Sequence, residues 1–172
     1  MQVIDRVTAS RLLEPLGMKI GGWNDLCALS PVDATYREHT PSSDALELYV
    51  AAHRLANWVV SGSWTLLQLD NSTSPAEDEI AIFEKLALKP WDIAEQHTFL
   101  LDDQGRQSTL VLLIYFALLF TWHIHLTSEA SLGGQRLALL DGVAYFFGPA
   151  PAIQSADELI KNAAANPRAL VP

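Results

Sequence analysis

The clearest pattern of apolar and polar positions starts near residue 44. From Leu46 to Trp58, apolar residues recur at steps of three and four, which is the spacing of one face of a helix. Ser43 or Asp44 can cap this run, and Glu47 follows Asp44 three positions later, the spacing of a capping box. The sequence therefore predicts an amphipathic helix over residues 44–60, with Leu46 on its inner face.

The same method predicts further elements on both sides of this helix. Period-four apolar positions indicate helices, and alternation of apolar and polar positions indicates half-buried strands. In chain order, the predicted elements are a helix over residues 8–16 with Ser10 as a competing N-cap, a strand near 18–23, a strand over 64–69, a helix over 76–88 with Ile80 and Phe83 facing inward, and an apolar helix over 110–120.

The last third of the chain predicts a β-meander followed by a helix. Strands are expected over residues 121–128, 135–140 and 143–147. Asp141-Gly142, between the last two strands, is typical of a type I′ turn, in which both central residues have positive φ. A final helix is expected over 155–165. The segment that joins it to the meander contains Gly and Pro, which end the sheet.

These elements predict one α+β domain spanning residues 1–172. We expect an antiparallel sheet, made of the C-terminal β-meander plus a central strand, packed with a single layer of helices on one face. No internal repeat, linker or low-complexity tract divides the chain.

Composition narrows the function classes. Hydrophobic residues make up 49% of the chain and charged residues 18%, against roughly 25% charged in an average globular protein. This balance excludes a disordered chain or a coiled coil. The formal net charge of −9 argues against nucleic acid as a partner, because phosphates would be repelled.

The uncharged stretch 107–128 raises the question of a membrane span. Its second half alternates as a strand does, through His123 and His125, so the apolar helix before it is too short to cross a bilayer. Asp5 and Arg6 stand where a signal peptide would need apolar residues. We therefore expect a cytoplasmic protein with no membrane partner.

Three sets of residues are candidates for catalysis or metal binding. His123 and His125 point to one face of a strand, but no third ligand stands at a telling spacing. Cys27 is the only cysteine and has no neighbouring base, and Ser63 lacks the glycine pattern of a nucleophile elbow. We therefore expect no metal, no cofactor and no enzymatic activity. A small metal-dependent enzyme using the two histidines remains the first alternative.

Negative charge is concentrated between residues 70 and 103. Nine carboxylates stand there against Lys85 and Lys89, a net charge of −7, while residues 1–69 carry −2 and residues 104–172 carry zero. A surface of one sign costs stability through self-repulsion, but it speeds the capture of a partner of opposite sign.

This segment supplies the predicted partner-binding site. Trp91 lies among the carboxylates, outside any clear core period, where an aromatic side chain would anchor a protein partner. The predicted site consists of Asp70, Glu77, Asp78, Glu79, Trp91, Asp92, Glu95, Asp102 and Asp103.

Three short segments of the sequence resemble a known class of proteins. LANWVVSGSWTLLQLDNS from Leu55, together with FTWHIHL from Phe120 and LDGVAYFF from Leu140, is similar in style to the immunity proteins that bacteria make against their own polymorphic or contact-dependent toxins. This resemblance implies a protein that neutralises a toxin, often a nuclease, by stoichiometric binding.

The predicted function is therefore a stoichiometric inhibitor that covers a basic toxin domain in a 1:1 complex through its acidic surface. A second alternative is an assembly subunit that buries the apolar segment 110–120 against a partner.

Overall fold

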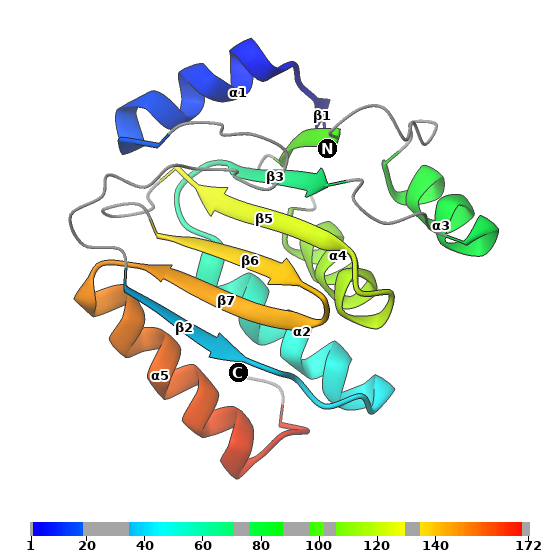
Figure 1. Ribbon diagram of the computed structural model, residues 1–172, viewed down its shortest axis with the longest axis vertical. Helices are drawn as coiled ribbons and strands as arrows, with labels where there is room; N and C mark the ends of the chain where they lie inside the picture. Colours follow the sequence, from blue (N-terminus) through cyan, green and yellow to red (C-terminus); the bar gives the residue numbers. More distant parts are fainter. Residues whose placement is uncertain are drawn as a thin grey trace.

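We describe a computed structural model over residues 2–18, 35–70, 76–87, 97–101, 106–129 and 135–169. Figure 1 shows a twisted sheet with helices packed around it. In chain order, the elements are β1 (Gln2–Val3), α1 (Arg6–Leu13), the short 3-10 helix η1 (Glu14–Leu16), β2 (Thr35–His39), α2 (Ala45–Val59), β3 (Thr65–Asp70), α3 (Glu77–Ala87), β4 (His97–Leu101), α4 (Arg106–Leu119), β5 (His123–Ser128), β6 (Arg136–Leu140), β7 (Val143–Gly148) and α5 (Ala150–Ala165).

The described strands form a seven-stranded sheet in the order β1-β4-β3-β5-β6-β7-β2. Every neighbouring pair is antiparallel. The α+β class with an antiparallel sheet is therefore confirmed. The meander β5-β6-β7 forms as predicted, and β3 lies against it as the central strand.

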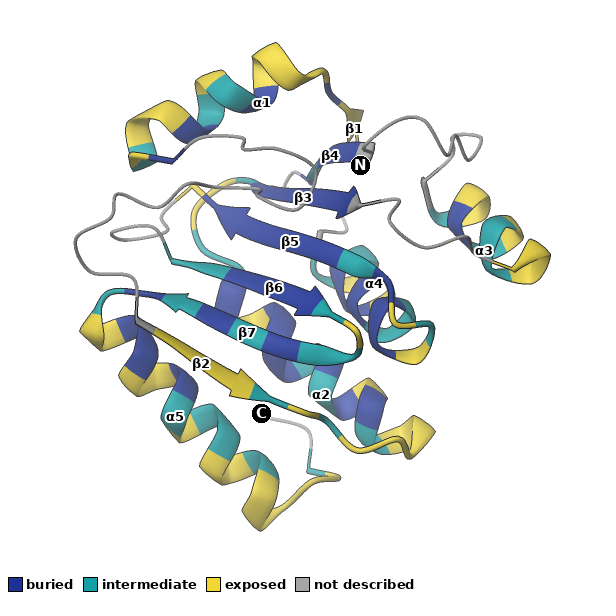
Figure 2. Cartoon of the chain, in the orientation of Figure 1, coloured by how far each residue is buried: buried dark blue, intermediate teal, exposed yellow. Residues whose placement is uncertain are grey.

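The main core lies between one face of the sheet and the helices α2, α4 and α5. Leu67, Leu126 and Leu137 stand side by side in the register of β3, β5 and β6, and all three are buried in this core. Figure 2 shows the central strands and the inner sides of α2 and α4 as buried. These helices form the predicted layer.

Helix α1 adds a smaller cluster on the opposite face of the sheet. Leu66 and Leu100, which are paired in β3 and β4, contact this cluster together with Ala9 and Leu13 of α1. Because their sheet neighbours Leu67 and Phe99 belong to the main core, the two clusters lie on opposite faces. The helix layer on one face is therefore supplemented by one helix on the other.

Local capping explains where the first two helices begin. The Asp44 side chain accepts hydrogen bonds from the backbone N–H groups of Leu46 and Glu47, at 3.1 and 3.0 Å, so of the two predicted candidates Asp44 caps α2. At α1, Asp5 takes this role by accepting from the N–H of Thr8 at 2.7 Å. Ser10 lies inside the helix, so the prediction that it competes as a cap was wrong.

Other predictions needed correction. Helix α5 starts at Ala150, earlier than expected, because a proline is tolerated in the first helical turn, where its missing N–H has no partner to lose. Leu46 is 53% exposed, because the inner face of α2 runs instead through Leu48, Ala52 and Leu55. Strands β1, β2 and β4 were not predicted. The predicted strand near 18–23 lies outside the described residues, apart from Met18.

None of the helices in the described ranges has both the length and the hydrophobicity needed to cross a bilayer. Helix α4, the most apolar of them, has 14 residues.

Candidate functional site

The structure describes part of the predicted acidic site. Glu77, Asp78 and Glu79 form the first turn of α3. Asp70 ends β3, in register with His123 of β5. Five predicted residues lie outside the described parts of the chain: Trp91, Asp92, Glu95, Asp102 and Asp103.

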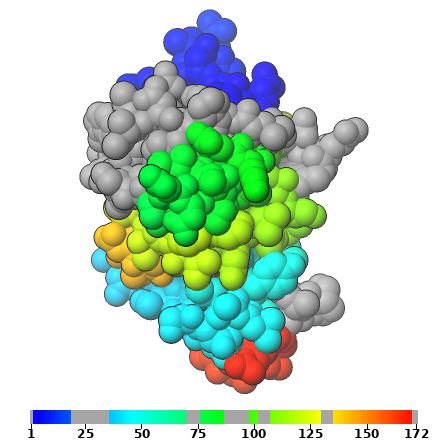
Figure 3. Space-filling view, turned by 90° about the vertical axis from the view of Figure 1, so that its right-hand side faces the viewer, coloured from blue at the N-terminus to red at the C-terminus, as the bar shows by residue number. Residues whose placement is uncertain are grey.

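Glu77 and Asp78 are exposed on a helix that projects from the molecule. Figure 3 views the molecule from the right-hand side of Figure 1, and α3 lies at the centre of the face that it shows. Asp78 accepts a hydrogen bond from the backbone N–H of Glu79 at 3.1 Å. Among the residues that the structure describes, neither Glu77 nor Asp78 has a cationic partner. Carboxylates in a first helical turn interact favourably with the helix dipole, which offsets part of their mutual repulsion.

Glu79 has a different environment. Its Oε2 accepts a hydrogen bond from the indole Nε1 of Trp122 at 2.9 Å, and the Trp122 side chain is buried. One turn further along α3, Phe83 is also buried, with its ring centroid 6.3 Å from that of Trp122. Glu79 and Phe83 thus hold α3 against the body of the protein and leave Glu77 and Asp78 facing solvent.

A continuous series of aromatic contacts leads from α2 to this anchor. Each ring in the series touches the next in edge-on, stacked or tilted geometry. The series runs Tyr49–Tyr115–Phe116–Phe120–Trp122, with centroid separations of 6.1, 5.3, 5.7 and 5.6 Å. Packed rings therefore link the outer sides of α2 and α4 to the acidic turn of α3, and the last of these rings, Trp122, is buried.

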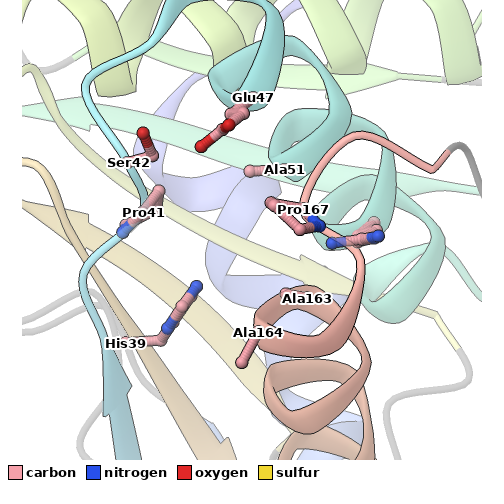
Figure 4. A pocket seen from close by; sticks show the side chains of 9 residues that line it. His39, Pro41, Ser42, Glu47, Ala51, Ala163, Ala164 and Pro167 are labelled. Atoms are coloured by element: carbon pink, nitrogen blue, oxygen red, sulfur yellow. The ribbon is translucent and has the colours of Figure 1, made fainter.

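A separate cleft of about 190 Å³ lies where β2, α2 and the end of α5 meet. Figure 4 shows Ser42 and Glu47 at one side of it and His39 apart from them, toward Ala164. Ser42 Oγ accepts a hydrogen bond from the Asp44 N–H at 3.1 Å, and Glu47 Oε1 accepts one from Arg168 at 3.3 Å. Since both side chains are committed to local structure, the cleft does not form a nucleophile–base pair among the described residues.

Arg54 lies buried behind this cleft. Its Nη2 donates to the backbone carbonyls of Asn166 and Ala169 at 2.6 and 2.9 Å, so it fixes the segment after α5 against α2. Burial, and then the positive charge of Arg54, lowers the pKa of His39. Sequence reasoning missed this arrangement, because Arg54 occupies an apolar helical position with no motif to mark it.

The two histidines of β5 share one face of the sheet, as predicted, but differ in environment. His123 Nε2 lies 2.9 Å from Asp141 Oδ1, next to the tight turn. His125 is 5% exposed, and both of its ring nitrogens are buried without a hydrogen-bond partner among the described residues. Burial, together with Arg136 and His123, lowers the pKa of His125 to about 4. In the part of the chain that is described, no three His, Cys, Asp or Glu side chains are grouped to bind a metal ion.

Cys27 lies outside the described residues. Ser63 Oγ donates a hydrogen bond to Glu129 Oε2 at 2.5 Å, and the same oxygen accepts one from the backbone N–H of Ser63 at 2.6 Å. Comparisons of the chain with protein-family models, curated proteins and solved structures give no match.

Proposed function

We propose that this protein is a stoichiometric inhibitor that binds and neutralises a cationic toxin domain, such as a nuclease domain, through the acidic surface around α3. The carboxylates would occupy positions that nucleic-acid phosphates take on such a domain. An inhibitor of this kind would act in the cytoplasm of the cell that makes it.

The single observation that carries the proposal is that Glu77 and Asp78 are exposed and have no ion pair with a described residue. Both are exposed on a projecting helix and, within the described residues, neither is neutralised by a cation of the same chain. They belong to the segment 70–103, whose net charge is −7. Such a surface would attract a basic partner over several ångströms and raise the association rate.

The test uses as probe the C-terminal domain of the protein encoded immediately upstream, which the proposal expects to be basic. We expect a 1:1 complex with this protein, whose association rate falls by about tenfold or more when the salt concentration rises from roughly 50 to 500 mM. The double variant Glu77→Gln/Asp78→Asn keeps side-chain size and removes two charges, so it should associate more slowly and with a weaker salt dependence.

The matched control is Glu38→Gln on β2 together with Glu158→Gln on α5, because both carboxylates are exposed and neither has an ion pair among the described residues. If the α3 pair and this control pair change the association rate equally, net charge acts without a specific acidic surface. An association rate that is independent of salt would contradict the proposal.

A further inference from the structure

Helix α4 carries apolar side chains on its outward side as well as its inward side. Leu112, Tyr115, Phe116 and Leu119 follow the spacing of one helical face, and Leu112 and Leu119 are 40 and 41% exposed. A solvent-facing helix usually carries polar or charged residues at such positions. Residues 107–128 carry no charge at all.

Helix α2 extends this apolar surface. Leu46 and Tyr49 are exposed on it, and the ring of Tyr49 lies 6.1 Å from that of Tyr115 on α4. Four of the seven large hydrophobic side chains that are exposed in the described ranges therefore belong to this helix pair: Leu46, Tyr49, Leu112 and Leu119. We call these four residues the α2–α4 surface.

The charges around the α2–α4 surface indicate the kind of partner it fits. At the start of α2, Asp44 and Glu47 are paired with Arg168, at 3.6 and 3.3 Å. On the other side, the aromatic series reaches α3, where Glu77 and Asp78 have no cationic partner among the described residues. Figure 3 shows α3, the yellow-green part of the chain beneath it and α2 one below another on the same side of the molecule.

We propose that the α2–α4 surface is the desolvated centre of the partner interface and that the α3 carboxylates form its charged rim. This inference rests on the proposed function and specifies the occupant: a protein with an apolar patch bordered by Lys and Arg. Interfaces generally combine a dry apolar centre, rich in aromatic residues, with a polar rim. A second copy of this chain fits less well, because two molecules of formal charge −9 repel each other.

The experiment compares Leu112→Ser and Leu119→Ser with the control Val7→Ser. Val7 is 60% exposed on α1, which packs on the opposite face of the sheet. With the same upstream-encoded domain as probe, we expect each α4 variant to raise Kd by about tenfold or more through faster dissociation. The salt dependence of the association rate should remain that of the wild type, and Val7→Ser should bind as the wild type does. Urea unfolding verifies that all three variants are folded.

Three outcomes would overturn the inference. If both α4 variants bind as tightly as the wild type while Glu77→Gln/Asp78→Asn slows association, the charged surface acts alone and only this inference fails. If the wild type sediments as a dimer that Leu119→Ser dissociates, the occupant is a second copy. If the wild type forms no complex with the basic domain, the proposed function itself fails, and that result is visible without any variant.

Discussion

Trp122 and Glu79 form a hydrogen bond between the indole Nε1 and Oε2, 2.9 Å long, across 43 positions of sequence. The bond joins α3 to the residues that connect α4 with β5. Because the Trp122 side chain is only 2% exposed, its N–H has little access to water if the carboxylate is lost. Glu79, which was predicted as a site residue from its charge alone, therefore also positions α3. This helix carries the exposed Glu77 and Asp78.

The first prediction concerns this bond. Glu79→Ala should lower the free energy of unfolding by about 1–3 kcal/mol, because it leaves a buried donor unsatisfied. Glu79→Gln retains an acceptor oxygen and should cost less than half as much. Urea unfolding followed by tryptophan fluorescence measures both. Equal losses for the two variants would mean that the charge of Glu79, and not its acceptor, stabilises α3.

The second prediction concerns pH. The pKa of His125 is about 4 in the folded protein, below its usual 6.5. Between these two pH values the unfolded chain binds a proton at His125 and the folded chain does not. The free energy of unfolding is therefore highest above pH 6.5, where His125 is neutral in both states, and it falls as the pH drops toward 4. At pH 5 the loss should be about 2 kcal/mol relative to pH 7.5.

His125→Leu removes this titration, because it replaces the imidazole with an apolar side chain of similar size at a buried position. The difference in unfolding free energy between pH 7.5 and pH 5 should therefore be about 2 kcal/mol smaller in the variant than in the wild type. Parallel pH profiles for the two proteins would show that His125 titrates normally.

The third prediction concerns the turn between β6 and β7. Asp141 and Gly142 both have positive φ, 52° and 77°, as a type I′ turn requires. A Cβ at Gly142 would meet only Thr121 Cγ2, at an ordinary 3.6 Å, so backbone strain alone opposes Gly142→Ala. We expect a loss of about 1–2 kcal/mol in thermal or urea unfolding.

Asp141→Asn is the matched control, because Asn also tolerates positive φ. It should change stability by less than about 0.5 kcal/mol. A larger loss would assign stability to the contact between Asp141 and His123.

The fourth prediction concerns the end of the chain beyond α5. Arg54→Met removes the donor to the carbonyls of Asn166 and Ala169, so the backbone amides of residues 163–166, 168 and 169 should exchange with deuterium faster. The pKa of His39 should rise, because one of the two causes that lower it is gone. Both changes are measurable by NMR.

Arg168→Ala serves as the comparison for Arg54, because it touches the same end of the chain from an exposed position. Its ion pairs with Asp44 and Glu47 lie at the surface, where each is worth less than about 1 kcal/mol. If it accelerates exchange as much as Arg54→Met does, the buried arginine has no special role.

The elements that could be predicted from the sequence are those with local signals. The cap at Asp44 and the turn at Asp141-Gly142 depend on residues within a few positions of each other, and both formed as predicted. Strand β4 lacks such a signal, because Phe99 faces the main core while Leu100 packs under α1, so no polar alternation appears. Strand β2 is short and largely polar. Its Arg37 donates a hydrogen bond to Asp157 on α5, which lies 120 positions away in the sequence.

The candidate site was only partly predictable for the same reason. A count of charges identifies Glu77 and Asp78, because exposure follows from their type. The step from Tyr49 to Tyr115 in the aromatic series could not be predicted, because these two rings meet only through the packing of α2 on α4. Whether a helical Leu such as Leu119 faces water likewise depends on which neighbours pack beside it.

The pairing of the outermost strands has a consequence for synthesis on the ribosome. Strands β1 and β2 both lie within the first 39 residues, yet they close opposite edges of the sheet, against β4 and β7. While the nascent chain is still short of Gly148, β2 has no complete partner. Strand β2 therefore joins the sheet only after β7 has left the exit tunnel, whereas β1 can pair once β4 has emerged.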